Sequence, residues 1–263
     1  MVEESGFQVG SDAPSAYEAH VARFMEPFVD FLVSATVSAG DSVLDVACGT
    51  GFATRAAAAV AGPGARVEGS DINPAMLAQA RSLADNSGAN LNWCEASALD
   101  LPFGDREFDA VICQQGLQFF PDPAAGVREL ARVARDGGRI GATVWSAATE
   151  SPLLYRETEM LAVHGGGAQA EFSVTEAQLR NWFEAGGVDR VEIERVEVEV
   201  DLPPVLTYVP QHLKALPWSA AFFALPDEQQ HTAIVELDAA LVEFKTADGI
   251  RVPFSSYLAT ASI

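Results

Sequence analysis

The sequence is poor in basic residues. Its 263 residues include 16 Lys or Arg against 37 Asp or Glu, a formal net charge of −21 at pH 7. Lys214 and Lys245 are its only lysines. Proteins that bind nucleic acid depend on Lys and Arg contacts to phosphates, and this charge balance opposes such contacts. We therefore expect no nucleic-acid partner.

Long apolar runs are also absent. No segment approaches the roughly 20 apolar residues that span a bilayer. Near the start of the sequence, acidic residues precede any apolar stretch, which is the reverse of a secretory signal. We expect a cytoplasmic protein with no membrane segment.

Cysteine is scarce too. Cys48, Cys94 and Cys113 form no C-x-x-C spacing, and each lies in an apolar, strand-like stretch. This pattern argues against a disulfide framework and against a metal site. The three residues are expected to be small buried hydrophobic side chains.

What the sequence does contain, from about residue 43, is an alternation of short β-rich apolar runs with alanine- or leucine-rich segments of helical period. The candidate strands are Val43–Ala47, Arg66–Ser70, Leu91–Glu95, Phe108–Cys113 and Arg139–Trp145. Such alternation is typical of βαβ units and of a parallel sheet covered by helices on both faces. The pattern predicts an α/β protein, and 263 residues fit one domain.

The segments before and after this alternation show other patterns of apolar residues. Residues 15–36 carry apolar residues at helical spacing, and Pro27 is expected to interrupt that helix. The remaining predicted elements are helices at Ser151–His164 and Thr175–Ala185, a strand at Val188–Val200, a helical cap insertion at about 203–247 and a last strand near Ser255–Ile263.

A ligand platform is predicted where the first strand ends. The segment VLDVACGTG turns through Gly49 and Gly51 into a helix. Glycine lets a ligand approach the backbone, and the helix N-terminus offers unpaired N–H groups. Asp71 ends the second strand 20 residues after Gly51, about the offset at which a carboxylate reaches ribose hydroxyls in Rossmann-type sites. The alternative is that Asp71 only caps the helix beginning at Pro74.

A nicotinamide-dinucleotide enzyme would also carry a glycine turn and a following acid. Here Phe52, Ala53 and Thr54 follow the second glycine, so the pyrophosphate fingerprint lacks its third glycine. A ligand without a pyrophosphate fits this turn better.

Several motifs, in this order, resemble the class I S-adenosylmethionine-dependent methyltransferases, particularly the group that acts on small molecules. The motifs are VLDVACGTG, the acidic region DINPAML, and EASALDLPFGDREFDAVICQQGLQFFPD, and the resemblance covers about Asp41–Trp145. It implies a Rossmann-like fold with a seven-stranded, mostly parallel sheet, an antiparallel last strand, helices on both faces, a helical N-terminal lid and a helical cap insertion. The single domain 1–263 would divide into lid helices in 1–40, a cofactor-binding core in 41–146, and acceptor-side helices, last strands and cap in 147–263.

The resemblance also implies which residues contact S-adenosylmethionine and its product S-adenosylhomocysteine. Carried over by position, they are Tyr17, Ala47, Gly49, Gly51, Asp71, Ile72, Met76, Ser97, Ala98 and Gln114. Asp71 would meet the ribose and Ile72 the adenine. Ser97 stands where the family usually has an acid, and Gln118 stands where many relatives carry histidine. Glutamine cannot act as a base near neutral pH, so any base must come from elsewhere.

Methyl transfer from a sulfonium requires alignment of donor and acceptor more than covalent help. For a hydroxyl acceptor, His164 and His212 are the candidate bases. His164 ends a predicted helix just before three glycines, and His212 lies in the cap near Tyr208 and Trp218. No order of carboxylates indicates a metal. The aromatic residues that could line an apolar acceptor pocket are Phe119, Phe120, Trp145, Trp218, Phe222 and Phe223.

The predicted function is in-line transfer of a methyl group to a hydroxyl, amine or carbon of a small apolar or aromatic molecule, as in biosynthesis. Two alternatives stay open: a cofactor-binding protein without turnover, or a non-methylating enzyme on the same fold. A dinucleotide oxidoreductase ranks below both. The oligomeric state is undetermined, with a homodimer as one option.

Overall fold

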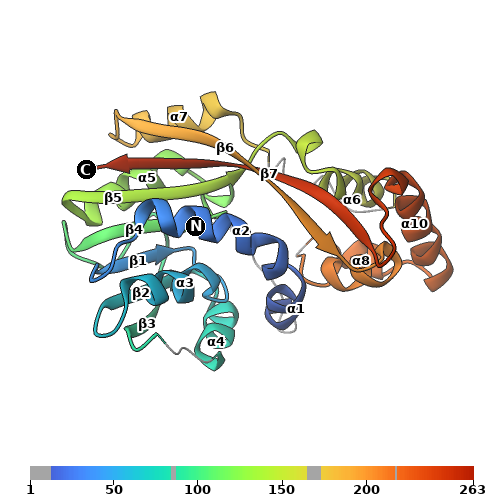
Figure 1. The fold of residues 1–263 in the computed structure, drawn as a ribbon, viewed down its shortest axis with the longest axis horizontal. Helices are drawn as coiled ribbons and strands as arrows, with labels where there is room; N and C mark the ends of the chain where they lie inside the picture. The colour runs from blue at the N-terminus through green and yellow to red at the C-terminus, as the bar shows by residue number, and fades with distance from the viewer. Residues whose placement is uncertain (1–12, 84–86, 165–172, 217) are drawn as a thin grey trace.

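The computed structural model describes residues 13–83, 87–164, 173–216 and 218–263, and these fold around a seven-stranded sheet (Figure 1). The strands are β1 (Val43–Val46), β2 (Arg66–Asp71), β3 (Asn90–Glu95), β4 (Phe108–Gln114), β5 (Ala134–Trp145), β6 (Val191–Leu202) and β7 (Ile250–Ser262). Their order is β3-β2-β1-β4-β5-β7-β6. The first five strands pair in parallel, and β7 is antiparallel to both of its neighbours. The predicted sheet, with its antiparallel last strand, is confirmed.

Helices cover both faces of the sheet, as predicted. On one face, α2 (Ala22–Thr36) and α3 (Phe52–Ala61) pack in a buried cluster with Val43 of β1; on the other, α5 (Pro123–Val133) and α7 (Glu176–Ala185) pack with Leu44 and Val46. Helix α4 (Pro74–Ser82) contacts β2 and β3. Successive residues of a strand point to opposite faces, so a strand covered on both sides needs the continuous apolar run that β1 carries.

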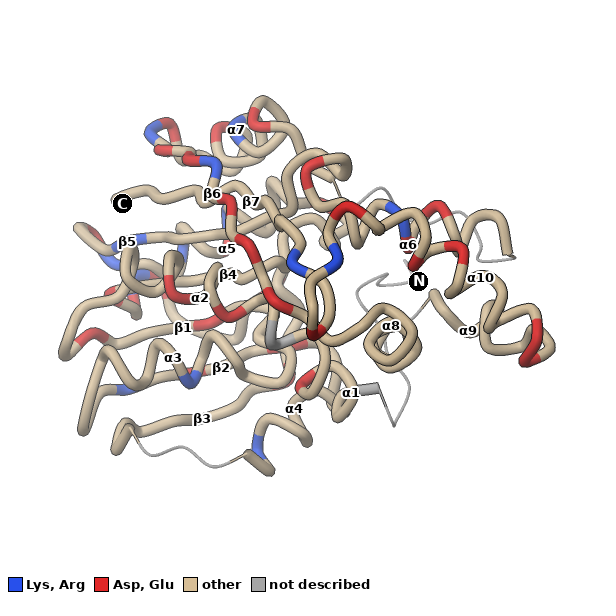
Figure 2. The backbone as a smooth tube through the Cα atoms, turned by 45° about the vertical axis from the view of Figure 1, so that its right-hand side comes forward, with Lys and Arg blue, Asp and Glu red and all other residues tan. Residues whose placement is uncertain are grey.

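Strands β6 and β7 form a long antiparallel pair, from Val191 opposite Ala261 to Leu202 opposite Ile250. Because β7 pairs along the whole of β6, it begins at Ile250 and not near residue 255 as predicted. Strand β5 also begins earlier than predicted, at Ala134, where it pairs with Phe108 across a register shift. Strand β6 is an edge strand in which buried residues are separated by exposed ones. Figure 2 shows several acidic residues spaced along it.

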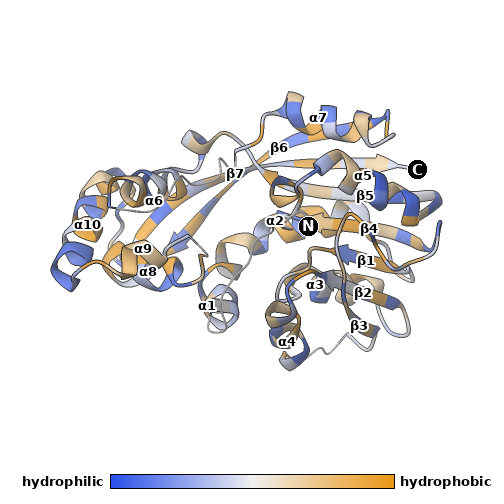
Figure 3. Cartoon of the chain, turned by 180° about the vertical axis from the view of Figure 1, so that it is seen from behind, coloured by the Kyte–Doolittle hydropathy of each residue, from blue (hydrophilic) through white to orange (hydrophobic). Residues whose placement is uncertain are grey.

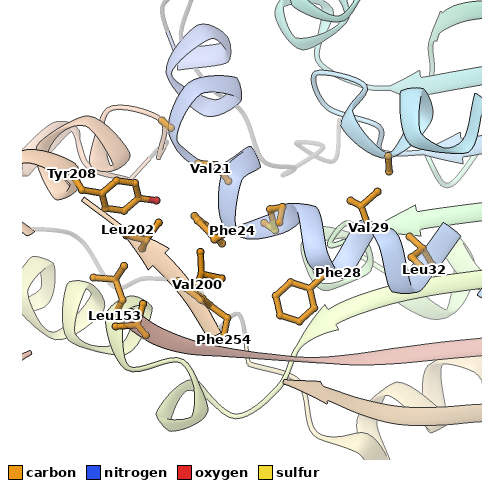
Figure 4. Close-up of a cluster of buried hydrophobic side chains, with 14 of the residues drawn as sticks. Val21, Phe24, Phe28, Val29, Leu32, Leu153, Val200, Leu202, Tyr208 and Phe254 are labelled. Atoms are coloured by element: carbon orange, nitrogen blue, oxygen red, sulfur yellow. The ribbon is translucent and has the colours of Figure 1, made fainter. Parts of the chain in front are cut away.

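At the N-terminal side, α1 (Ala13–His20) and α2 meet at Val21. Pro27 lies inside α2, so the predicted interruption there is wrong. Pro27 lies in the second helical turn. Because proline has no N–H group, it removes one hydrogen bond of the helix. Figure 4 shows Phe24 and Phe28 of α2 directed toward β6, β7 and the cap, where they join buried residues such as Phe254.

The remaining helices gather mostly at one end of the sheet (Figure 3). They are α6 (Pro152–Val163), α8 (Val205–Leu213), α9 (Ala220–Phe223) and α10 (Asp227–Ala240), with short 3-10 segments η1 (Leu117–Phe119), η2 (Ala148–Glu150) and η3 (Val242–Phe244). Helices α8, α9 and α10 form the insertion between β6 and β7, and α8 contacts α1. In the described part of the chain, no helix has the length and apolar character needed to cross a membrane.

Candidate functional site

A cavity of about 380 Å³ lies beyond the ends of β1 and β4 and is bordered by α1, α2, α6 and α8. Strand order reverses between these two strands, because β2 and β3 lie on one side of β1 while β4 and β5 continue on the other. Open α/β sheets bind ligands at this switch point, outside the carboxyl ends of the strands. The volume falls within the range of small-molecule sites, about 300–1,000 Å³.

Backbone strain is concentrated at this point of the sheet. Ala47 after β1 (φ 57°) and Gln115 after β4 (φ 53°) are two of the three non-glycine residues with positive φ in the described chain. Both line the cavity, as does Gly49 at φ 55°. A side chain in the left-handed region costs about 1–3 kcal/mol and is found preferentially at functional sites. The strain therefore marks the ends of β1 and β4 as the functional part of the sheet.

Gly51 does not line the cavity, unlike the other predicted cofactor-binding residues. It precedes α3 with φ 81°, and a Cβ at this position would lie 2.1 Å from Cη2 of Trp93. The left-handed backbone and the indole ring thus account for glycine at 51 without a ligand. A contact between Gly51 and the cofactor stays a prediction.

Asp71 is held at the cavity by backbone groups. Its Oδ2 accepts a hydrogen bond from Gly49 N at 2.8 Å, and its Oδ1 accepts one from Asn73 N at 2.8 Å. Burial raises the pKa of this carboxyl, while the N–H groups of Asn73, Gly49 and Ile72 oppose the increase. Asn73, not Asp71, is the N-cap of α4 and accepts from Ala75 N at 2.9 Å. The alternative of Asp71 as the cap of that helix is therefore wrong.

The other predicted cofactor-binding residues also line this cavity: Tyr17, Ile72, Met76, Ser97, Ala98 and Gln114. Ser97 Oγ accepts from Leu99 N at 3.2 Å, which leaves its hydroxyl hydrogen to donate elsewhere. Burial raises the pKa of the Tyr17 hydroxyl, and the nearby carboxylates of Asp71 and Glu18 raise it further. Tyr17 therefore stays a neutral hydroxyl at the cavity wall.

Helix α1 is attached to the glycine turn by Glu18. Its Oε2 accepts from Thr50 Oγ1 at 2.5 Å, and its Oε1 pairs with Arg55 Nη2 at 2.5 Å. Arg55 also donates to the Thr50 carbonyl at 2.7 Å. These contacts hold the helix that carries Tyr17 against the start of α3.

Aromatic rings form much of the opposite wall. Of the six aromatic residues proposed for the acceptor side, Phe119, Phe120, Trp145 and Trp218 line the cavity, whereas Phe222 and Phe223 do not. Phe24 also lines the cavity, although it was not predicted to do so. Its ring contacts both Trp145, at a centroid distance of 6.1 Å, and His212, at 5.5 Å. It also stacks on Phe254 at 4.8 Å.

The two candidate bases are in very different places. His212 lines the cavity, and its Nδ1 lies 3.0 Å from Oε1 of Glu157, which lines the cavity too. His164 does not line the cavity; its Nε2 is 3.8 Å from Glu236, whose side chain is 68% exposed. The predicted position of His164 over the acceptor is therefore corrected. The glycines at 165–167 that follow it lie outside the described residues.

Sequence reasoning missed several polar cavity residues, among them Glu157 and Ser146, whereas the end of β4 at Gln114 and Gln115 was expected near the cofactor. Gln115 donates from Nε2 to Ser256 Oγ at 2.8 Å and accepts from Gln118 Nε2 at 3.0 Å. Gln118 itself does not line the cavity. A signal for Glu157 did exist, because it shares the buried face of α6 with Leu153 and Leu161 at helical spacing.

Metal ligation has no support among the described residues, where no group of three His, Cys, Asp or Glu side chains could hold an ion. Cys48 and Cys113 are buried, and Cys94 is half-buried, more exposed than predicted.

Part of the chain is similar to known proteins. Residues 43–138 match the family model described as a methyltransferase domain. A 131-residue segment is 40% identical to an uncharacterised protein of Mycobacterium tuberculosis and covers 49% of this chain and 47% of that protein. A 106-residue segment is 42% identical to the ubiquinone/menaquinone biosynthesis C-methyltransferase of Hahella chejuensis and covers 40% of this chain and 43% of that enzyme. The matched segments thus span slightly less than half of either relative.

The likeness to solved structures is broader. The YcgJ protein of Bacillus subtilis matches with a TM-score of 0.60 over 89% of this chain and 97% of its own, at 18% sequence identity. At this identity the match shows a shared fold.

Proposed function

We propose that the protein is a class I S-adenosylmethionine-dependent methyltransferase, because residues 43–138 match the family model of a methyltransferase domain and the sheet has the Rossmann-like order. The acceptor we propose is a small, apolar or aromatic molecule, methylated at a hydroxyl in preference to an amine or carbon. One observation carries the proposal. Nine of the ten residues expected to contact the cofactor line a single cavity at the switch point of the sheet, although they come from separate parts of the sequence.

The residues present fit the cofactor chemically. Asp71 already accepts two N–H bonds, but an ionised carboxylate has about four acceptor positions and can also take ribose hydroxyls. Ile72 and Met76 offer an apolar surface for the adenine, and a Cβ at Gly49 would meet nothing within 4 Å, so the backbone there is open to a ligand. When bound, S-adenosylmethionine supplies an activated methyl group. The chain would then bind the cofactor and the acceptor, orient them for methyl transfer and exclude water.

The acceptor assignment is supported by the aromatic wall and by the position of His212. Phe24, Phe119, Phe120, Trp145 and Trp218 suit a planar, apolar molecule. His212 is the histidine at this wall, so we assign it the role of general base for the acceptor hydroxyl.

The first test is calorimetric titration of the purified protein with S-adenosylmethionine, S-adenosylhomocysteine and NAD in parallel. We expect a Kd on the order of micromolar for the first two and no heat with NAD. Binding of NAD alone would identify an oxidoreductase, and silence from all three would favour a protein without cofactor function.

If the cofactor binds, incubation with a methyl-labelled donor and a panel of lipophilic phenols tests turnover. Transfer of label to a phenol supports the proposed reaction. Cofactor binding without transfer to any acceptor, together with chemical conversion of an unlabelled substrate, would instead indicate a non-methylating enzyme on this fold.

A further inference from the structure

We propose that Glu157 is a positioning residue for His212, and that the pair recognises an acceptor by a hydroxyl on a planar apolar ring, a phenol or an enol. This inference rests on the proposed function and adds to it the residue that orients the base and the chemical class of the acceptor.

The two side chains of the pair are buried and in direct contact. The His212 and Glu157 side chains are only 1% and 3% exposed, and Nδ1 and Oε1 are 3.0 Å apart. In the described structure, Glu157 forms no ion pair with Lys or Arg. A buried carboxylate requires a hydrogen-bond donor, and the imidazole is the partner that the fold supplies.

This contact determines which ring nitrogen can act as a base. We interpret the 3.0 Å contact as a hydrogen bond that His212 Nδ1 donates to Oε1 of Glu157, so that Nδ1 carries the ring proton. In the neutral ring, Nε2 then holds the lone pair, and Nε2 is the nitrogen left for a molecule in the cavity. The same carboxylate stabilises the positive charge that the ring acquires when it takes a second proton.

Packing keeps the ring in this orientation. Tyr208 stacks on His212 with centroids 5.6 Å apart and an interplanar angle of 11°, and Phe24 meets the ring edge-on at 82°. Tyr208 is itself anchored, because its hydroxyl donates to the His20 carbonyl at 2.6 Å. The imidazole therefore has little freedom to turn Nδ1 away from Glu157.

The surroundings of the pair define the acceptor. Phe24 links His212 to Trp145, so an aromatic wall runs from the base along the cavity. Ser146, the residue after Trp145, lines the same cavity, and its buried Oγ has no hydrogen-bond partner among the described residues. A flat apolar molecule with a hydroxyl for His212 and a second polar group for Ser146 satisfies both sites.

The proposed step moves one proton and one methyl group. The acceptor O–H proton moves to His212 Nε2 as an oxygen lone pair forms a bond to the methyl carbon, and the C–S bond breaks with its electron pair moving to sulfur. The products are a methyl ether, neutral S-adenosylhomocysteine and an imidazolium, which releases its proton to solvent.

Other titratable groups surround the pair and would affect its pH profile. His20 interacts electrostatically with His212 and with Lys214, and Tyr208 stacks on the His212 ring. Burial lowers the pKa of His20, and its electrostatic interactions with His212 and Lys214 lower it further. These groups remain unchanged in the variants below, so differences between variants report on Glu157.

The test compares Glu157→Gln with Glu236→Gln, the matched control that alters the His–Glu contact outside the cavity. The probes are 4-methylphenol, largely protonated at about pH 8.5, and 4-nitrophenol, which is largely ionised there. For Glu157→Gln we expect kcat/KM to fall about 10- to 100-fold with 4-methylphenol and to change little with 4-nitrophenol, which has no proton left to remove. Glu236→Gln should behave like the wild type with both phenols.

Two further measurements distinguish a positioning role of Glu157 from a purely structural one. In a His212→Gln background, Glu157→Gln should add no further loss, because it acts through the missing ring. In ¹⁵N-histidine spectra, the neutral wild-type ring should carry its proton on Nδ1, a readout that needs neither turnover nor an identified acceptor.

Equal losses with both phenols, additive losses in the double variant, or an Nε2-protonated ring in the wild type would each overturn the role of Glu157. Normal S-adenosylhomocysteine affinity with no methylation of any phenol would overturn the acceptor class and leave the proposed cofactor intact. If the wild-type protein does not bind the cofactor, the proposed function itself is wrong.

Discussion

At the scale of single residues, Asp71 combines two tasks. Its two oxygens hold the amides of Gly49 and Asn73 and so shape the turn around the cavity. Its remaining acceptor positions are those we assign to ribose hydroxyls. An amide in its place would keep the size of the side chain but lose one acceptor oxygen and the charge.

We therefore expect Asp71→Asn to raise the Kd for S-adenosylhomocysteine by at least about tenfold, because hydrogen bonds to charged groups contribute about 1.5–3 kcal/mol. Calorimetric titration measures the affinity, and circular dichroism checks the fold. The control is Asp30→Asn, an exposed carboxylate on α2. Unchanged affinity in folded Asp71→Asn protein would remove Asp71 from the binding site.

At the scale of elements, the position of α1 depends on a small polar cluster. Glu18 joins this helix to Thr50 and Arg55, and the Arg55 and Glu18 side chains are only 17% and 21% exposed. Since α1 also carries Tyr17 at the cavity wall, release of Glu18 should loosen the cover over the cofactor.

For Glu18→Gln we expect bound S-adenosylhomocysteine to dissociate about fivefold faster, which corresponds to about 1 kcal/mol for a partly exposed ion pair. Stopped-flow displacement by excess ligand measures this rate. Glu26→Gln, on the exposed face of α2, should dissociate at the wild-type rate. If both variants release ligand at the wild-type rate, α1 does not retain the cofactor.

At the scale of the whole molecule, a buried acid in β1 makes the free energy of unfolding depend on pH. Asp45 of β1 is fully buried, and its Oδ2 accepts from Thr54 Oγ1 at 2.6 Å. Burial raises its pKa to about 7, the Thr54 hydrogen bond lowers it, and Asp71 raises it. Its Oδ1 has no partner within the described residues, as suits a carboxyl that keeps its proton in the folded state.

The raised pKa sets the sign of the effect. The unfolded chain releases this proton near pH 3.8, whereas the folded chain keeps it up to about pH 7. Between these values the folded state binds more protons, so the free energy of unfolding decreases as the pH rises. This stabilisation is complete below the unfolded pKa and is lost as the pH passes through the folded pKa.

Asp45→Asn has no proton to release. We expect its free energy of unfolding, relative to the wild type, to increase by about 2 kcal/mol from pH 5 to pH 8. Urea denaturation at the two pH values measures the difference, and Asp30→Asn should show a pH-independent difference. A constant difference for Asp45→Asn would mean that Asp45 is ionised in the folded protein.

Features that depend on local pattern could be predicted from the sequence. Alternation of buried strands and helical segments specified the α/β sheet, because burial on both faces requires continuous apolar runs. The motifs from Val43 onward also located the residues that gather at the cavity, since consecutive parallel strands bring their carboxyl ends to one edge. Pro27 shows the limit of local reasoning, because packing of α2 against the sheet and cap outweighed the cost of a proline in a helix.

Which histidine faces the cavity, and which residue contacts it, became clear from the packing of α6 and α8. His212 and Glu157 are 55 positions apart and belong to α8 and α6. Nothing along the chain links them, because a contact between two helices depends on their packing angle and rotation, which side chains from several elements set together. The same holds for Gly51, whose requirement for glycine became clear only when the ring of Trp93 was found beside it.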